Sequence, residues 1–290
     1  MLKKFQFITQ YLFYPGVLCF GVFLAFWAKQ KEIPETLIVS VLMILTTVTI
    51  FIFQRHFPFS RRWKFTWLDF RVDILHAFFS MGGVPFLIQI LILGSVFQLA
   101  TWGSETLTIS LWPNQWPILI QFILALVAGE FGSYWVHRFC HEKSFLWKIH
   151  AVHHSPERLY ALSSGRNHPF NVALSYSSQV IPLILMGASK DVLYFQAVFT
   201  GLHGLLQHSN IKMNTLFLSW FFSTPHLHRY HHSREIEVSN ANYGSNIILW
   251  DIIFRTWHCP KKQPSDDVGL PKGTNFPEDY LGQLVSPFKF

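Results

Sequence analysis

The 290-residue chain is half hydrophobic, contains 30 Phe and 11 Trp, and has only 13% charged residues. A soluble domain is usually about a quarter charged, so this composition argues for a membrane protein. The net charge of +7 comes from basic residues scattered among apolar spans, without the basic stripe of a nucleic-acid-binding protein. Cys19, Cys140 and Cys259 provide neither a disulfide framework nor a CxxC metal knuckle.

Four apolar stretches are long enough to cross a bilayer, which takes about 20 mostly apolar residues. They run over Tyr11–Ala28, Thr36–Phe53, Ile74–Ala100 and Trp116–Val136. The third stretch contains Gly82-Gly83 and Pro85, so we expect it to be kinked, tilted or broken at that point.

The loops between these stretches differ in charge. Lys3 and Lys4 precede the first stretch, the segment 54–72 carries five Arg and Lys residues, and the segment 101–115 carries none. The positive-inside rule therefore predicts that the N-terminus and the segment after the fourth stretch are cytoplasmic. A bacterial inner membrane is expected rather than the endoplasmic reticulum, because Ser286–Phe290 carries no retrieval signal of the KDEL type.

Two shorter apolar stretches, Val172–Ala188 and Val192–Leu206, predict a hairpin that dips into the membrane or lies in its interface. The expected fold is all-α: about four spanning helices plus this short hairpin, capped by a cytoplasmic, helical, histidine-rich metal-binding region. We expect a single integral-membrane domain over 1–290, with the transmembrane helices in 1–136. The proline-rich tail over 259–290 is expected to be irregular.

Twelve of the fifteen histidines lie in two windows, 137–168 and 203–232. Three sets have spacings that place their imidazoles on one face of a helix. They are HxxxH at His137 and His141, HxxHH at His150, His153 and His154, and HxxHH at His228, His231 and His232. Without metal, so many imidazoles packed together would leave many nitrogens without partners. Eight imidazoles exceed the needs of one ion, so the sequence predicts a dinuclear site.

Other metal sites fit the sequence less well. A structural zinc takes four ligands, usually including cysteine. A zinc protease needs HExxH, and His141-Glu142 begins that pattern, but Phe145 stands at the second histidine position. Soluble di-iron bundles use glutamates, and acidic residues are few near the histidine sets. We therefore expect a dinuclear site made of histidines alone.

The order HxxxH, HxxHH, HxxHH, with apolar spans before and between, resembles the fatty acid hydroxylase/sterol desaturase superfamily over residues 130–256. Flanking segments are similar as well: Tyr134–Arg138, Leu146–Lys148, Gln207–Asn210, Thr224-Pro225, Asn242–Gly244 and Trp250-Asp251. The chain departs from the family at Glu130, where Asp is common, and at Arg255, where Gly is usual. The second departure leaves the conformation of the local turn undecided, but it does not affect the predicted metal site.

The resemblance implies a catalytic region over 130–256 whose metal site is also its only catalytic machinery. The implied ligands are His137, His141, His150, His153, His154, His208, His228, His231 and His232. Two non-haem iron ions would use O2 to hydroxylate or desaturate a lipid C–H bond, in a sterol, fatty acyl chain or ether lipid. An apolar cavity open to the bilayer would admit this substrate. Electrons would come from a ferredoxin-like or cytochrome-like partner, because the chain has no flavin, haem or iron–sulfur motif.

Three further histidines stand outside the motifs. His168 and His226 are expected to serve as structural residues or hydrogen-bond partners of ligands, whereas His203 is left open as a ligand. Asn242 either orients a ligand or water, or simply makes a turn before Gly244.

Arg138 and Arg166 either bind acidic partners or lipid headgroups, or are ordinary interface arginines.

Two alternative functions fit the sequence less well. A multi-histidine metal transporter would place ionisable residues near mid-membrane, whereas these sets lie at span ends. A non-catalytic, lipid-binding member of the superfamily is disfavoured because all three histidine sets are complete.

Overall fold

The computed structural model describes residues 2–64, 66–107 and 111–289. Among these residues, β-type pairing is limited to three isolated bridges, so the predicted all-α fold is confirmed. In chain order the elements are α1 (Leu2–Gln30), α2 (Glu35–His56), α3 (Trp67–Leu75), η1 (His76–Gly83), α4 (Val84–Ile88), η2 (Gln89–Leu93), α5 (Gly94–Leu107), α6 (Ile118–Glu142), α7 (Ser144–His154), η3 (Ala161–Gly165), α8 (Pro169–Leu185), α9 (Lys190–Gln207), η4 (Leu218–Trp220), α10 (Pro225–His231), α11 (Ile236–Ser239), α12 (Leu249–Ile253), α13 (Tyr280–Val285) and η5 (Ser286–Phe288).

The starts of the long helices follow local chemistry. Pro34 and Pro117 directly precede α2 and α6, where the missing N–H removes no helical hydrogen bond. The side chains of Ser189 and His168 accept hydrogen bonds from the first turns of α9 and α8. These caps set the bounds of the helices that carry the histidines.

Four helical segments are long and apolar enough to cross a membrane: Thr9–Gln30, Glu35–His56, Trp67–Thr106 and Ile118–Glu142. They match the four predicted spans. Large apolar side chains on their outer faces are exposed in the isolated chain, including Phe20 at 61% and Ile44 at 62%. Such extensive apolar exposure is suited to lipid rather than to water.

The third span is helical throughout, so the break considered at Gly82-Gly83 and Pro85 does not occur. The helix instead widens into the π-helical segments η1 and η2 on either side of α4. A π turn tolerates the missing N–H of proline by shifting the hydrogen-bond pattern. The span of 40 residues is about 60 Å long at about 1.5 Å per residue, twice a hydrocarbon core of about 30 Å.

The two shorter apolar stretches form α8 and α9, a helical hairpin that turns at Gly187 with a φ of 95°. Neither helix is among the four candidate spans, and their depth in a membrane stays a prediction. α8 packs closely on α6, where a Cβ on Gly132 would collide with the backbone of Ser178. α9 packs on both α1 and α6.

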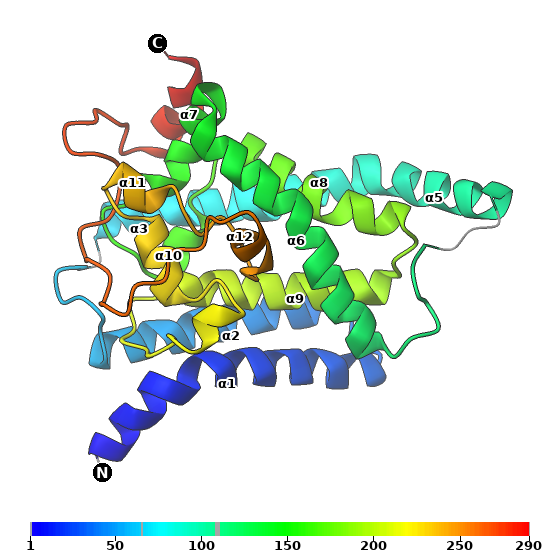
Figure 1. Cartoon of the computed structure of the whole chain (residues 1–290), viewed down its shortest axis with the longest axis horizontal. Coiled ribbons are helices and arrows are strands. Elements are labelled where there is room, and N and C mark those ends of the chain that lie inside the picture. Colours follow the sequence, from blue (N-terminus) through cyan, green and yellow to red (C-terminus); the bar gives the residue numbers. More distant parts are fainter. Residues whose placement is uncertain (1, 65, 108–110, 290) are drawn as a thin grey trace.

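The short helices α7, α10, α11 and α12 form a cap at one end of the long helices (Figure 1). The prediction of an irregular tail over 259–290 is wrong for its last residues, which form α13 and η5. Asp279 caps α13 by accepting a hydrogen bond from the Gly282 N–H. Buried Gln283 accepts a hydrogen bond from His76 Nε2 at 2.9 Å, which anchors the tail to the third span.

Candidate metal centre

Four elements bring the nine predicted ligands together. α6 carries the HxxxH pair near its end, α7 carries the first HxxHH set, and the second set lies on α10 and the residue that follows it. His208 terminates α9. These four elements thus bring together histidines that lie up to 95 residues apart in the chain, from His137 to His232.

The ligand atoms form two groups, and within each group they lie within 4.8 Å of one another. The five-histidine group consists of His137, His141, His150, His154 and His231. The four-histidine group consists of His153, His208, His228 and His232. Two imidazoles on opposite sides of an ion at about 2.1 Å are about 4.2 Å apart, so each group is close to the size of one metal site.

Helical geometry explains how the HxxHH sets are divided. His150 and His154, four residues apart, enter the five-histidine group, whereas His153 enters the other. In the second set, the i, i+4 pair His228 and His232 enters the four-histidine group. Neighbouring residues differ by about 100° around a helix, so each set reaches both metal positions at once.

Oxygen atoms outside the groups hold the Nδ1 atoms of the imidazoles. His137 donates to the Tyr243 carbonyl at 2.7 Å and His153 donates to the Arg166 carbonyl at 3.2 Å. His231 donates to the Ala241 carbonyl at 2.9 Å. A carbonyl oxygen only accepts, so in these rings the proton lies on Nδ1 and the lone pair lies on Nε2.

Side-chain oxygens hold three more rings. Asn240 Oδ1 faces His141 Nδ1 at 3.1 Å, Asn171 Oδ1 faces His150 Nδ1 at 3.2 Å, and Ser163 Oγ faces His208 Nδ1 at 3.1 Å. Partners of this kind fix ring orientation and raise ligand basicity. Sequence reasoning did not single out these partners, because nothing in the spacing shows which distant oxygens meet the rings.

The Nε2 atoms face inward. Those of His137 and His150 lie 3.1 Å apart, and those of His208 and His228 lie 2.8 Å apart. Among the described residues, the buried Nε2 atoms of His141, His154 and His231 have no hydrogen-bond partner. Converging lone pairs are the donor set of a metal centre, and imidazole suits iron, copper, zinc and nickel. The residues therefore fit the iron ions that the sequence resemblance implies.

Burial keeps the rings outside the spans neutral. It lowers the pKa of His153 to about 3, and it lowers the pKa values of His150, His154 and His208 well below the usual value. Desolvation is the main cause, and neighbouring imidazoles add to it. Neutral imidazole is the form that binds metal, so the site is prepared for ligation at neutral pH.

A cavity of about 240 Å³ reaches both groups, with His137 and His150 from one and His153, His208 and His228 from the other in its wall. Its remaining wall comes from the third span, α6, η3, Asn167, α8, α9 and the loop residues Gly244 and Ser245. Many wall residues are polar types, but Asn171 and Gln207 turn polar atoms to internal hydrogen bonds. The cavity surface is consequently largely carbon, in line with the apolar cavity expected from the resemblance.

The other candidate histidines lie outside both groups. His203 accepts from the Tyr14 hydroxyl or donates to it at 2.6 Å, and its Nδ1 faces the Ser245 carbonyl. His226 donates to the Pro260 carbonyl. His168 donates to the Leu284 carbonyl while its other nitrogen caps α8. All three are structural hydrogen-bond residues.

The turn interpretation of Asn242 is confirmed. Its φ is 56°, and its side-chain amide pairs with both backbone groups of His258. Arg255, where the family usually has Gly, has a φ of 59°. The left-handed turn is therefore kept with an arginine, at the cost of about 1 to 2 kcal/mol of backbone strain.

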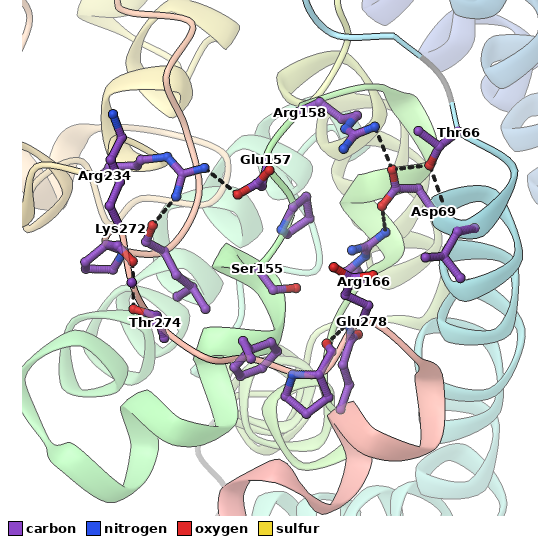
Figure 2. A pocket seen from close by; sticks show the side chains of 18 residues that line it. Thr66, Asp69, Ser155, Glu157, Arg158, Arg166, Arg234, Lys272, Thr274 and Glu278 are labelled. Carbon is purple, nitrogen blue, oxygen red and sulfur yellow. Dashed lines mark hydrogen bonds and ion pairs between the residues drawn. The ribbon is translucent and has the colours of Figure 1, made fainter.

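Arg166 does not present a free charge to an acidic partner or lipid headgroup. It lies in the wall of a second cavity, of about 500 Å³, where its guanidinium pairs with Asp69 at 3.1 Å (Figure 2). The same guanidinium also pairs with Asp73 at 2.5 Å. Figure 2 also shows Arg158 directed to Asp69. Arg138 forms an i, i+4 ion pair with Glu142 at 2.7 Å. Both arginines thus have their charges paired with acidic residues of the chain itself.

Comparison with known proteins agrees with this geometry. The chain is 35% identical to the ornithine lipid hydroxylase OlsE of Rhizobium tropici, over 96% of this chain and 83% of the relative. The fatty acid hydroxylase family profile matches residues 122–256, which include all nine histidines. The chain belongs to the fatty acid hydroxylase family. It is a membrane hydroxylase, an oxidoreductase with histidine groups able to bind metal.

More distant relatives are larger proteins. Human alkylglycerol monooxygenase is 30% identical over 52% of this chain, and the zebrafish (Danio rerio) protein is 32% identical over 50%. The chain covers only about a third of the length of these relatives, 33% and 31%. No solved structure matches the chain.

Proposed function

We propose that the protein is an O2-dependent hydroxylase of a membrane lipid, with two iron ions held by the nine imidazoles. The observation that carries the proposal is the convergence of nine histidines, seven of them buried, into two groups that share one cavity wall. Iron is among the metals that imidazole suits, and the pairing of two groups suits a two-metal centre.

The protein's own residues would bind and orient the substrate and shield the reaction from water. The imidazoles would hold the irons, and the iron would supply the activation of O2 that inserts oxygen into a C–H bond. One oxygen atom enters the product and the other leaves as water, which takes two electrons from an external donor and two protons. A ferredoxin-like or cytochrome-like protein is the proposed donor.

The first candidate substrate is ornithine lipid, because the name of the Rhizobium tropici relative gives it as an ornithine lipid hydroxylase. The cavity wall between α8 and α9 includes Tyr176, Gln179 and Thr200. The Thr200 hydroxyl is buried and has no partner among the described residues. These side chains offer hydrogen bonds to a polar group of the lipid while the carbon surface accommodates its methylenes.

The basic segment between α2 and α3 leads us to propose that the histidine cap faces the cytoplasm of a bacterial inner membrane. This orientation would give a soluble electron donor direct access to the cap.

The test is to express the wild type and a His153→Ala variant in cells that make ornithine lipid, and to compare their lipids by mass spectrometry. We expect wild-type cells alone to accumulate a lipid that carries one additional oxygen atom. Purified wild type should contain two irons per chain, and its turnover should consume O2. Loosely exchanging zinc without O2 consumption would contradict the proposal and favour a metal-transport role.

A further inference from the structure

The loop from Asn240 to Asn246 holds three rings of the five-histidine group. It supplies the Asn240 side chain to His141, the Ala241 carbonyl to His231, and the Tyr243 carbonyl to His137. The loop lies between α11 and α12 and has no helical hydrogen-bond ladder of its own. Its shape must therefore be fixed by contacts with other parts of the chain.

Glu130 provides one of these contacts. It lies on α6, about two turns before His137, and is completely buried. Its Oε1 accepts the N–H groups of Ser245 and Asn246, and its Oε2 accepts the Asn246 side-chain N–H at 2.9 Å. The helix that carries two ligands thus also grips the loop that orients them.

Asp251 provides the other contact, from α12. It is also completely buried, and its two oxygens accept the N–H groups of Tyr243 and Gly244, both at 2.8 Å. Thr256 donates a third hydrogen bond at 2.7 Å. A Cβ on Gly244 would lie 2.8 Å from Asp251 Oδ2, so only glycine allows this approach.

Four successive backbone N–H groups, from Tyr243 to Asn246, thus point at two buried carboxylates. Among the described residues, neither carboxylate forms an ion pair, so hydrogen bonds replace their lost hydration. Burying a carboxylate is costly, and using two on one seven-residue loop indicates a need for a fixed loop position.

We propose that Glu130 and Asp251 are positioning residues for the five-histidine group. They act through the loop, which holds the Nδ1 atoms of His137, His141 and His231 and so aims the Nε2 atoms inward. The proposal rests on the proposed metal centre, but it concerns one group only. The four-histidine group takes its outer partners from Arg166 and Ser163, which lie outside this loop.

The test is Co2+ titration of the purified, metal-free full-length protein in detergent, followed by its visible absorption. We expect Glu130→Ala to weaken binding of one of two Co2+ ions by about ten-fold, the lower end for the loss of an outer partner. The second ion should bind as in the wild type. Glu130→Gln should behave nearly as the wild type, because its carbonyl oxygen still accepts both backbone N–H groups.

Glu130→Asp tests reach rather than charge. It keeps the carboxylate but withdraws it by about 1.5 Å, one carbon–carbon bond, and should resemble the Ala variant. Asp251→Ala is expected to affect the same Co2+ ion. Glu35→Gln, which removes an acid paired with Lys29 near the start of α2, is the matched control and should change neither ion.

Equal weakening of both ions would indicate a general structural role and overturn the proposal, as would wild-type Co2+ binding by a folded Glu130→Ala variant. If that variant fails to fold, Asn246→Ala removes only the side-chain hydrogen bond and should weaken the same ion more mildly. If the purified wild type binds two Co2+ ions but cells that express it make no hydroxylated lipid, the proposed function is refuted while this inference stands.

Discussion

The two histidine groups differ most in what surrounds them. In the five-histidine group, four of the Nδ1 atoms face an oxygen acceptor outside the group. In the four-histidine group only two do, while the buried Nδ1 atoms of His228 and His232 have no partner among the described residues. The first group is thus held from outside on nearly every ring, and the second is held on half of its rings.

The outer supports also differ in charge. The loop behind the five-histidine group is held by two carboxylates without ion pairs, whereas the carbonyl behind His153 belongs to Arg166, which is paired with Asp73 and Asp69. Outer partners commonly change metal affinity by about 10- to 100-fold. We therefore expect the five-histidine group to bind its metal more tightly than the four-histidine group.

Removal of one ligand from each group is the strongest way to test this difference. We expect His150→Ala and His228→Ala each to lose one iron and to lower hydroxylation by more than about 100-fold, beyond the usual effect of outer partners. Metal analysis and product formation measure both effects.

His226→Ala is the matched control, because His226 lies on α10 but belongs to neither group; it donates to the Pro260 carbonyl and its ring packs on Tyr230. It should retain both irons. If His228→Ala kept two irons while His226→Ala lost one, the assignment of the groups would be wrong.

The ion pair behind the four-histidine group predicts a large stability effect. Arg166→Leu leaves Asp73 fully buried without its guanidinium, and among the described residues only the Tyr160 hydroxyl remains bonded to the Asp73 carboxylate. Breaking one side of such a buried pair costs about 3 to 5 kcal/mol. We expect a matching loss in the free energy of unfolding, measured by denaturation in detergent.

The Arg166→Leu, Asp73→Leu double variant removes both charges and should recover much of this stability. Metal loss in Arg166→Leu should begin with the four-histidine group. A single variant as stable as the wild type would show that the ion pair is not needed to hold the Arg166 carbonyl.

The sequence predicted which histidines come together better than it predicted their surroundings. Spacing along a helix is local, so the HxxxH and HxxHH patterns located eight imidazoles, and the family resemblance added His208. The long apolar runs located the four spans for the same reason. Helical spacing also separates His153 from His154, but which group each one joins depends on how α7 and α10 face each other, which no local pattern records.

The outer partners were beyond reach because they are tertiary contacts. Glu130 contacts residues 115 positions away, and Asn171 reaches His150 from another helix. The sequence left the role of Arg166 open because its ion-pair partners lie on α3, about 95 positions away. The helical end of the tail was missed since it depends on a cap and on contact with His76.

Single outer partners should have a smaller effect than ligands or buried charges. Asn171→Ala removes the acceptor of His150 and should weaken the metal of the five-histidine group, whereas Ser163→Ala should weaken the other. The expected loss is about 10- to 100-fold in affinity for one ion. Titration with Co2+ separates the two sites, and identical effects of both variants on the same ion would contradict the assignment.

Acid should reveal the buried imidazoles as a graded loss of stability in the metal-free protein. The folded-state pKa of His153 is about 3, below the usual value of 6.5, and burial also lowers those of His228 and His150. Below pH 6.5 the unfolded chain therefore binds protons that the folded chain does not, so stability falls as pH falls. Each such histidine contributes about 1.4 kcal/mol per pH unit to the loss in the free energy of unfolding.

His228→Ala and His150→Ala should each reduce the slope of stability against pH by one histidine's share, measured by denaturation between pH 6.5 and about pH 5. Equal reductions would show that the two groups share the same dry interior and differ only in their outer partners, whereas an unchanged slope in one variant would place that histidine in contact with water.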